Sequence, residues 1–156
     1  MFRLSNLIKS TLENQKSRTL NGSIMIWNFT NRCNLLCHHC YSKADANEKD
    51  TLTFEEIEQT ISKLKAGGVN FVIFSGGEPL LRKDIFDIAK VMKEYNIMTY
   101  LSTNGIYVSP KNVDQIIETF NYIGISIDGI EEIHDQFRGQ KGAYKKSNEP
   151  LKLIQA

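Results

Sequence analysis

From residue 23 onward, the sequence alternates short apolar runs with longer segments whose apolar residues recur at helical spacing. The apolar runs are rich in β-branched and aromatic residues, which favours strands; they span 24–29, 71–74, 97–101 and 122–127. The predicted helices begin near residues 53, 84, 109 and 143. This order predicts right-handed βαβ crossovers and a parallel sheet, and an open three-layer sheet and a barrel both fit it.

Three of the predicted helices carry start signals. Thr53 and Glu56 have the spacing of a capping box. Asp84 is an expected N-cap, and Pro110 suits the first position of a helix. The side chains expected to face the core from the second and third helices are Ile85, Ile88, Met92, Tyr95, Val113, Ile116, Ile117 and Phe120.

All three cysteines of the chain lie within eight residues, at Cys33, Cys37 and Cys40, with the spacing C-x3-C-x2-C. Thiolates are the usual ligands of iron–sulfur clusters, so this loop can hold three irons of a cuboidal cluster and leave the fourth iron open. A structural zinc site that adds His38 or His39 is an alternative, and so are inert buried thiols. A disulfide framework fits poorly, because the cysteine count is odd and the cysteines crowd one loop.

Polar residues follow the second, third and fourth predicted strands. Gly76 and Gly77 allow a ligand to approach the backbone, and Glu78 beside them adds a charge. Site residues favour the carboxyl ends of parallel strands, where we expect Ser102, Asn104, Ser126 and Asp128. The last two alternate, which puts them on one face of the predicted fourth strand. Ordinary turn chemistry is the alternative for all of these positions.

The cysteine spacing is followed by the run Ser75-Gly76-Gly77-Glu78-Pro79, which begins 35 residues after Cys40. Together they resemble the signatures of the radical S-adenosylmethionine (radical SAM) family. The resemblance implies a partial (β/α)6 barrel, here truncated after about four β/α units. It also implies a 4Fe–4S cluster on the three cysteines, with SAM on the fourth iron. SAM would be split reductively to a 5′-deoxyadenosyl radical that abstracts hydrogen from the substrate. No catalytic residue beyond the cluster ligands is assigned.

In the family, the Gly-Gly-Glu-Pro run binds the amino group of SAM, and polar residues at the later strand ends hold its ribose and carboxylate. The resemblance therefore implies cofactor-binding roles for Gly76, Gly77, Glu78, Ser102, Asn104, Ser126 and Asp128. His39 occupies a position where many members place an aromatic residue beside the adenine, and Tyr41 lies close by. Arg138 either reaches a carboxylate of SAM or substrate or forms a helix-capping ion pair.

Several longer strings resemble the NirJ branch of the family, which acts in haem d1 biosynthesis. They are 1–5, 27–30, 41–42, 75–82, 124–129 and 134–139. This resemblance implies a sirohaem-derived tetrapyrrole substrate, 12,18-didecarboxysirohaem, which loses propionate side chains. It also implies an electron donor such as ferredoxin or flavodoxin. A peptide-modifying radical SAM maturase and a non-catalytic metal-binding module are the alternatives.

The chain divides into an amphipathic extension and linker at 1–22 and a core domain at 23–156. In the extension, Leu4, Leu7, Ile8 and Leu12 have helical spacing. The helix that begins near Ala143 has no stop signal before Ala156. We therefore expect the core domain to be incomplete at its C-terminus and the 156 residues to be inactive alone.

The net charge of +1 gives no electrostatic case for a nucleic acid partner. No stretch approaches the roughly 20 apolar residues of a membrane span, and the first ten residues lack the apolar run of a signal peptide. We expect a cytoplasmic location, which suits an oxygen-sensitive cluster.

Overall fold

The computed structural model describes residues 22–154. The amphipathic segment predicted near the N-terminus lies outside this range. Four strands are present: β1 (Ser23–Thr30), β2 (Val69–Gly76), β3 (Met98–Thr103) and β4 (Tyr122–Ile125). The helices are α2 (Phe54–Ala66), the 3-10 turn η1 (Pro79–Leu81), α3 (Ile85–Glu94), α4 (Val113–Thr119), α5 (Glu132–Arg138) and α6 (Ala143–Ile154).

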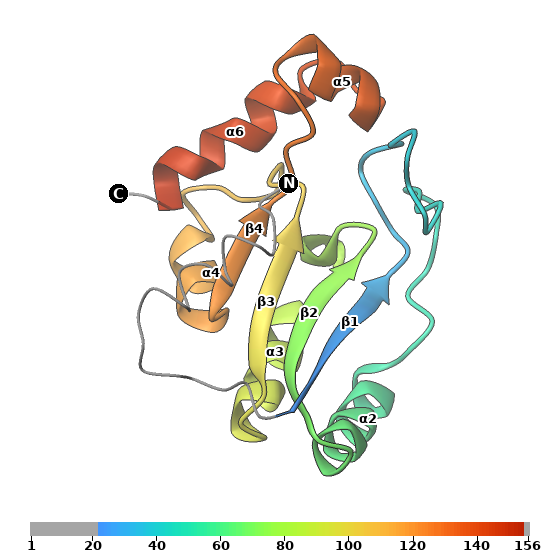
Figure 1. Ribbon diagram of the computed structural model, residues 1–156, viewed down its shortest axis with the longest axis vertical. Helices are drawn as coiled ribbons and strands as arrows, with labels where there is room; N and C mark the ends of the chain where they lie inside the picture. The colour runs from blue at the N-terminus through green and yellow to red at the C-terminus, as the bar shows by residue number, and fades with distance from the viewer. Residues whose placement is uncertain (1–21, 155–156) are drawn as a thin grey trace.

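The four strands form one parallel sheet in the order β1-β2-β3-β4 (Figure 1). Each strand is followed by helical structure before the next strand begins, so the predicted α/β class with four β/α units is confirmed. Because all strands run the same way, their carboxyl ends meet at one edge of the sheet. In Figure 1 this is the upper edge, beside the loop after β1 and helix α5.

Helices α2, α3 and α4 cover one face of the sheet. Buried side chains of all three helices pack with strand residues in a single apolar core. The centre of that core is aromatic: Phe29 stacks between Trp27 and Phe74 at ring-centroid distances of 4.5 and 4.4 Å. Phe120, which follows α4, meets Phe74 edge to face at 5.2 Å. On the opposite face of β1, Ile24 and Ile26 are exposed within the part of the chain that the structure describes.

The start signals of the helices have different outcomes. The capping box of α2 is confirmed, since the Thr53 hydroxyl accepts from Glu56 N and the Glu56 carboxylate accepts from Thr53 N. Asp84 occupies the N-cap of α3 but makes no side-chain cap. Its carboxylate instead binds the buried Arg82 guanidinium through two contacts of 2.7 and 2.9 Å. The predicted inward face of α3 is wrong at Tyr95, which is 37% exposed at the end of the helix.

The third predicted helix begins later than expected. Ser109 and Pro110 lie in a preceding turn, where the Asn112 side chain accepts from Ser109 N, and α4 starts at Val113. The prediction that Ile117 faces inward is wrong, since its side chain is 44% exposed.

The region after β3 departs further from the sequence-based expectations. β4 ends at Ile125, two residues earlier than predicted. Helix α5 was not predicted at all, because its seven residues are too few for a clear apolar period. Helix α6 begins at Ala143 as expected. Across residues 22–154, none of the helices combines the length and apolar character needed to cross a membrane.

Candidate functional site

The three cysteines and the strand ends line one cavity of about 270 Å³ at the carboxyl edge of the sheet. We call it the cysteine cavity. The predicted site residues that line it are Cys33, Cys37, Cys40, Gly76, Gly77, Ser102, Asn104, Ser126 and Asp128. His39 and Tyr41 also lie on its wall, as does Arg138. Residues from four separate loops therefore converge where parallel strands end, which is the usual place for a site in such a sheet.

Backbone hydrogen bonds hold the cysteine loop at several points. Cys33 N donates to Asp45 O at 2.9 Å, and Cys40 N donates to Cys37 O at 3.1 Å. Further along, His38 N donates to Phe137 O of α5, also at 2.9 Å. Cys33 is buried and the other two cysteines are partly exposed. Within residues 22–154, no three or more His, Cys, Asp or Glu side chains gather closely enough to hold a single metal ion.

The environments of the three thiols differ. Burial raises the pKa of the Cys33 thiol, and burial also raises that of Cys37 in spite of the nearby Arg138 guanidinium. Burial acts in the same direction on Cys40, but hydrogen bonds from Ser42 and from neighbouring backbone N–H groups outweigh it and lower the pKa of that thiol. Cys40 Sγ lies 3.3 Å from Ser42 Oγ. Cys40 is therefore the thiol that ionises most readily.

Gly76 and Gly77 line the cavity and also allow the end of β1 to pack close to β2. A Cβ at Gly76, whose φ is +128°, would collide with the Thr30 carbonyl oxygen. A Cβ at Gly77 would collide with that of Arg32. Gly77 N donates to Thr30 O and Glu78 N to Arg32 O, both at 2.8 Å. The glycines thus have a packing reason for their small size, whatever they contribute to ligand binding.

Glu78 lies under the cavity rather than on its wall. Its side chain is 0% exposed, and its carboxylate accepts from Thr103 Oγ1 at 2.7 Å, Asn104 N at 2.8 Å and Leu80 N at 3.1 Å. Burial raises the pKa of this carboxyl, while these hydrogen bonds and the Arg138 charge act against the shift. Glu78 therefore joins the loops after β2 and β3.

Two of the later strand-end residues are fixed by neighbouring loops. Asn104 Nδ2 donates to Asn34 Oδ1 of the cysteine loop at 2.8 Å, and its own Oδ1 accepts from Ile106 N. Ser126 lies just beyond β4, so the prediction that it shares a strand face with Asp128 is wrong. Ser126 N still donates to Thr103 O at 2.9 Å, which extends the pairing of β3 and β4 toward the cavity.

Helix α5 organises the far wall of the cavity around Asp128. The buried His134 accepts from Asp128 N through Nδ1 at 3.2 Å, and burial lowers the pKa of this imidazole. One turn later, Arg138 Nε lies 2.6 Å from Asp128 Oδ2. The i, i+4 spacing of His134 and Arg138 in the sequence was the signal for this arrangement. Of the two roles left open for Arg138, the structure shows an ion pair, with Asp128.

The residues that line the cysteine cavity have the chemistry to hold a cuboidal cluster and an adjoining polar ligand. Three thiols from one loop supply the ligand chemistry of such a cluster. Arg138 Nη1 lies 3.8 Å from Cys37 Sγ, and a positive charge favours the thiolate form that binds iron. Beside the thiols, the backbone of Gly76 and Gly77 and the hydroxyls of Ser102 and Ser126 provide polar groups for a second molecule.

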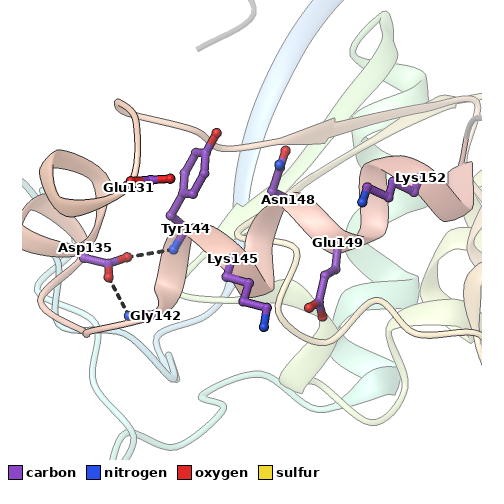
Figure 2. Close-up of a pocket in the computed structure, with 8 residues that line it drawn as sticks. All are labelled: Glu131, Asp135, Gly142, Tyr144, Lys145, Asn148, Glu149 and Lys152. Atoms are coloured by element: carbon purple, nitrogen blue, oxygen red, sulfur yellow. Dashed lines mark hydrogen bonds between the residues drawn. The ribbon is translucent and has the colours of Figure 1, made fainter.

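A second cavity, of about 400 Å³, lies between α5 and α6 (Figure 2). We call it the α5–α6 cavity. Asp135 accepts from Gly142 N and from Tyr144 N, the latter at 2.8 Å, and so ties the start of α6 to α5. The remaining lining residues drawn in Figure 2 are Glu131, Lys145, Asn148, Glu149 and Lys152, and their charges are mixed.

A parallel βα sheet whose strand ends meet three cysteines spaced C-x3-C-x2-C has the fold and site of a radical SAM protein. The chain belongs to the radical SAM superfamily, whose sequence model matches residues 27–155. This superfamily uses a 4Fe–4S cluster and SAM as cofactors.

Among curated proteins, the chain is 41% identical to the pre-heme d1 synthase of Dinoroseobacter shibae over 94% of its own length and 38% of that protein. It is 40% identical to the Fe-coproporphyrin III synthase of Methanosarcina barkeri over 78% of the chain and 31% of that protein. The chain thus spans less than two-fifths of the length of these relatives.

The solved structure of native anSMEcpe with bound AdoMet and the Cp18Cys peptide has the same fold. It matches with a TM-score of 0.68 at 23% identity, over 85% of this chain and 39% of that one.

Proposed function

We propose that this chain binds a 4Fe–4S cluster and SAM, and that the radical made from SAM abstracts hydrogen from a propionate side chain of a sirohaem-derived tetrapyrrole, as in haem d1 biosynthesis. The observation that carries the proposal is the convergence of three thiols with three polar strand ends in one cavity. The likeness to a pre-heme d1 synthase over nearly the whole chain supports the substrate class.

Cys33, Cys37 and Cys40 would hold the cluster, which when bound supplies the electron that splits SAM. The protein's part is to hold the two cofactors against each other and to exclude water. Cys33 is buried, and it is the thiol best shielded from solvent. Asn34 and Asn104 tie the cysteine loop to the end of β3 on one side of the cavity.

For SAM, we propose that Gly76 and Gly77 receive the amino group and that Ser102, Asn104 and Ser126 hold the ribose and carboxylate. Glu78 has its three hydrogen bonds within the protein, so its effect on SAM runs through the loop that it fixes and through its charge. Asp128 forms an ion pair with Arg138. When this pair separates, Arg138 can bind the carboxylate of SAM and Asp128 can accept a hydrogen bond from a hydroxyl of SAM.

A peptide substrate is the second candidate, because the structural relative with a matching fold holds a peptide together with AdoMet.

The electron would come from a low-potential donor such as ferredoxin or flavodoxin. We propose a cytoplasmic location, since reducing compartments keep thiols free to bind iron.

Metal analysis of anaerobically purified and reconstituted protein tests the cofactor part. We expect about four irons and four sulfides per chain, as the cluster requires, and a change in the electron paramagnetic resonance (EPR) spectrum of the reduced cluster on adding SAM. The matched control is the chain with all three cysteines changed to Ala, which should bind neither. Stoichiometric zinc without sulfide would overturn the proposal and favour a metal-binding module.

Substrate class is tested by titrating the reconstituted protein with 12,18-didecarboxysirohaem and following the visible absorbance of the tetrapyrrole. We expect a saturable spectral change that SAM enhances. A cysteine-containing peptide serves as the competing ligand. Saturable binding of the peptide, with no spectral response to the tetrapyrrole, would replace the haem d1 assignment by a peptide-modifying one.

A further inference from the structure

Arg138 lies between a cluster ligand and a carboxylate. Its Nη1 is 3.8 Å from Cys37 Sγ, and its Nε is 2.6 Å from Asp128 Oδ2. The two charged side chains are only 11% and 19% exposed. His39 Nε2 lies 3.8 Å from the same Asp128 oxygen, so this carboxylate contacts both the Arg138 guanidinium and the His39 imidazole. A guanidinium in this setting is poorly screened by solvent, and its field at the sulfur is strong.

The Arg138 side chain is not needed to dock the cysteine loop on α5, because backbone groups already make that contact. His38 N donates to Phe137 O at 2.9 Å. Gly139 packs so closely under Leu36 that a Cβ there would collide with the Leu36 carbonyl oxygen. The ring of His39 also meets that of Phe137 at 5.3 Å. The Arg138 charge is therefore an addition to a loop contact that stands without it.

We propose that Arg138 sets the reduction potential of the cluster through Cys37, and that Asp128 limits the effect by neutralising part of its charge. This inference rests on the proposed function, since it needs the cluster. Reduction adds one electron to the cluster and its thiolate ligands and transfers no proton here; the donor, dithionite in the test, is oxidised. A nearby positive charge stabilises the reduced form, because hydrogen bonds to sulfur and net charge are two ways in which proteins tune such clusters.

The two charges predict shifts of opposite sign. Replacing Arg138 by Gln removes the cation and should make the cluster harder to reduce. Replacing Asp128 by Asn leaves the cation unneutralised and should make the cluster easier to reduce. Both variants break the same Arg138–Asp128 ion pair. If they acted only by loosening the loop, both should shift the reduction potential in the same direction.

The experiment is an EPR-monitored redox titration of the reconstituted protein without SAM, with iron and sulfide measured on each sample. For Arg138→Gln we expect the ratio of reduced to oxidised cluster at a given potential to fall about tenfold. For a one-electron couple this corresponds to a midpoint potential that is more negative by about 59 mV. For Asp128→Asn we expect a smaller shift to more positive values. If Arg138→Gln fails to hold a cluster, Arg138→Lys is measured instead. This variant keeps the positive charge, so its midpoint potential should stay near that of the wild type.

Lys145→Gln is the matched control, since it removes one positive charge from an exposed position on α6 and should leave the potential unchanged. Equal potentials in wild type and Arg138→Gln, or shifts of the same sign in Arg138→Gln and Asp128→Asn, would overturn the inference and leave the proposed function standing. A wild-type chain without a 4Fe–4S cluster would overturn both.

Discussion

Helix α5 borders two cavities, and the larger one has fewer features of a site. The α5–α6 cavity measures about 400 Å³ and the cysteine cavity about 270 Å³. The cysteine cavity brings together the loops after all four strands. The α5–α6 cavity is lined by residues that lie within 22 positions of one another in the sequence. Long-range convergence, rather than volume, distinguishes the functional candidate.

A carboxylate that binds loop backbone lies under the cysteine cavity, and another lines the α5–α6 cavity; the two differ in environment. Glu78 is fully buried and joins the loops after β2 and β3. Asp135 lies nearer to solvent and joins the loop before α6 to α5. Burial raises the pKa of Glu78, whereas hydrogen bonds from Tyr144 N and Gly142 N lower the pKa of Asp135. Hydrogen bonds lower the pKa of both carboxyls, and only the burial of Glu78 is strong enough to reverse the net shift.

The largest contrast between the cavities is expected for Cys37→Ala. The loss of one of three ligands leaves too few thiolates to hold the cluster, so the brown chromophore and the EPR signal should disappear. Tyr144→Phe, in the α5–α6 cavity, is the control and should keep full iron and sulfide. Full cluster occupancy in Cys37→Ala would refute the assignment of the cysteine cavity.

The next contrast is in stability. Glu78→Gln places an amide N–H₂ against a backbone N–H, of Leu80 or of Asn104, in a buried site, so we expect a loss of about 1–3 kcal/mol in the free energy of unfolding. Urea denaturation measures it as a lower midpoint at an unchanged m value. Glu149→Gln, an exposed change of the same kind, should have no effect. A wild-type midpoint for Glu78→Gln would show that the three hydrogen bonds contribute little.

The dependence of stability on pH should differ in sign between the two carboxylates. The folded-state pKa of Glu78 is raised above its usual value near 4.5, so the native state binds more protons and stability falls as pH rises above that value. The folded-state pKa of Asp135 is lowered below 3.8, so its contribution is present above 3.8 and is lost on further acidification.

Urea midpoints of the wild type, Glu78→Gln and Asp135→Asn from pH 3 to pH 8 test both signs. The difference between wild type and Glu78→Gln should shrink as pH rises, and that between wild type and Asp135→Asn should shrink as pH falls toward 3. Parallel pH curves for all three proteins would contradict this account.

The smallest effect is expected for Asp135→Asn at neutral pH. The Asn side chain keeps one acceptor oxygen for Gly142 N or Tyr144 N and loses the other, at a partly solvated position. We expect a loss of stability below that of Glu78→Gln and an unchanged iron content, measured on the same reconstituted samples. A loss of the cluster in Asp135→Asn would show that the two cavities are coupled through α5.

The sheet and the main site could be predicted because their signals are local. The capping box at Thr53, the β-branched runs and the cysteine spacing are each complete within a few residues, and the structure places them as expected. The exact start of α4 could not be predicted, because Ser109 and Pro110 lie in a turn in which the Asn112 side chain accepts from Ser109 N. The cap at Asp84 failed for a similar reason: a buried Arg82 binds its carboxylate.

The supporting contacts of the site could not be predicted from sequence. Two of the three partners of Glu78, Thr103 and Asn104, lie 25 and 26 residues downstream, and Arg138 contacts Cys37 across 101 residues. Such pairings depend on which strands become neighbours. The role of His134 in holding Asp128 had a weak signal only, the i, i+4 spacing with Arg138.

The close approach of Gly77 to Arg32 means that the glycine pair in the sequence indicates the fold rather than the binding of SAM. Because a Cβ at Gly77 would collide with the Arg32 carbonyl oxygen, the β1 end could not keep its path if this glycine were replaced. A descendant that no longer used SAM would still need the glycine in order to fold. The glycine pair is therefore diagnostic of the architecture, and only the thiols beside it, which no backbone contact demands, are diagnostic of the chemistry.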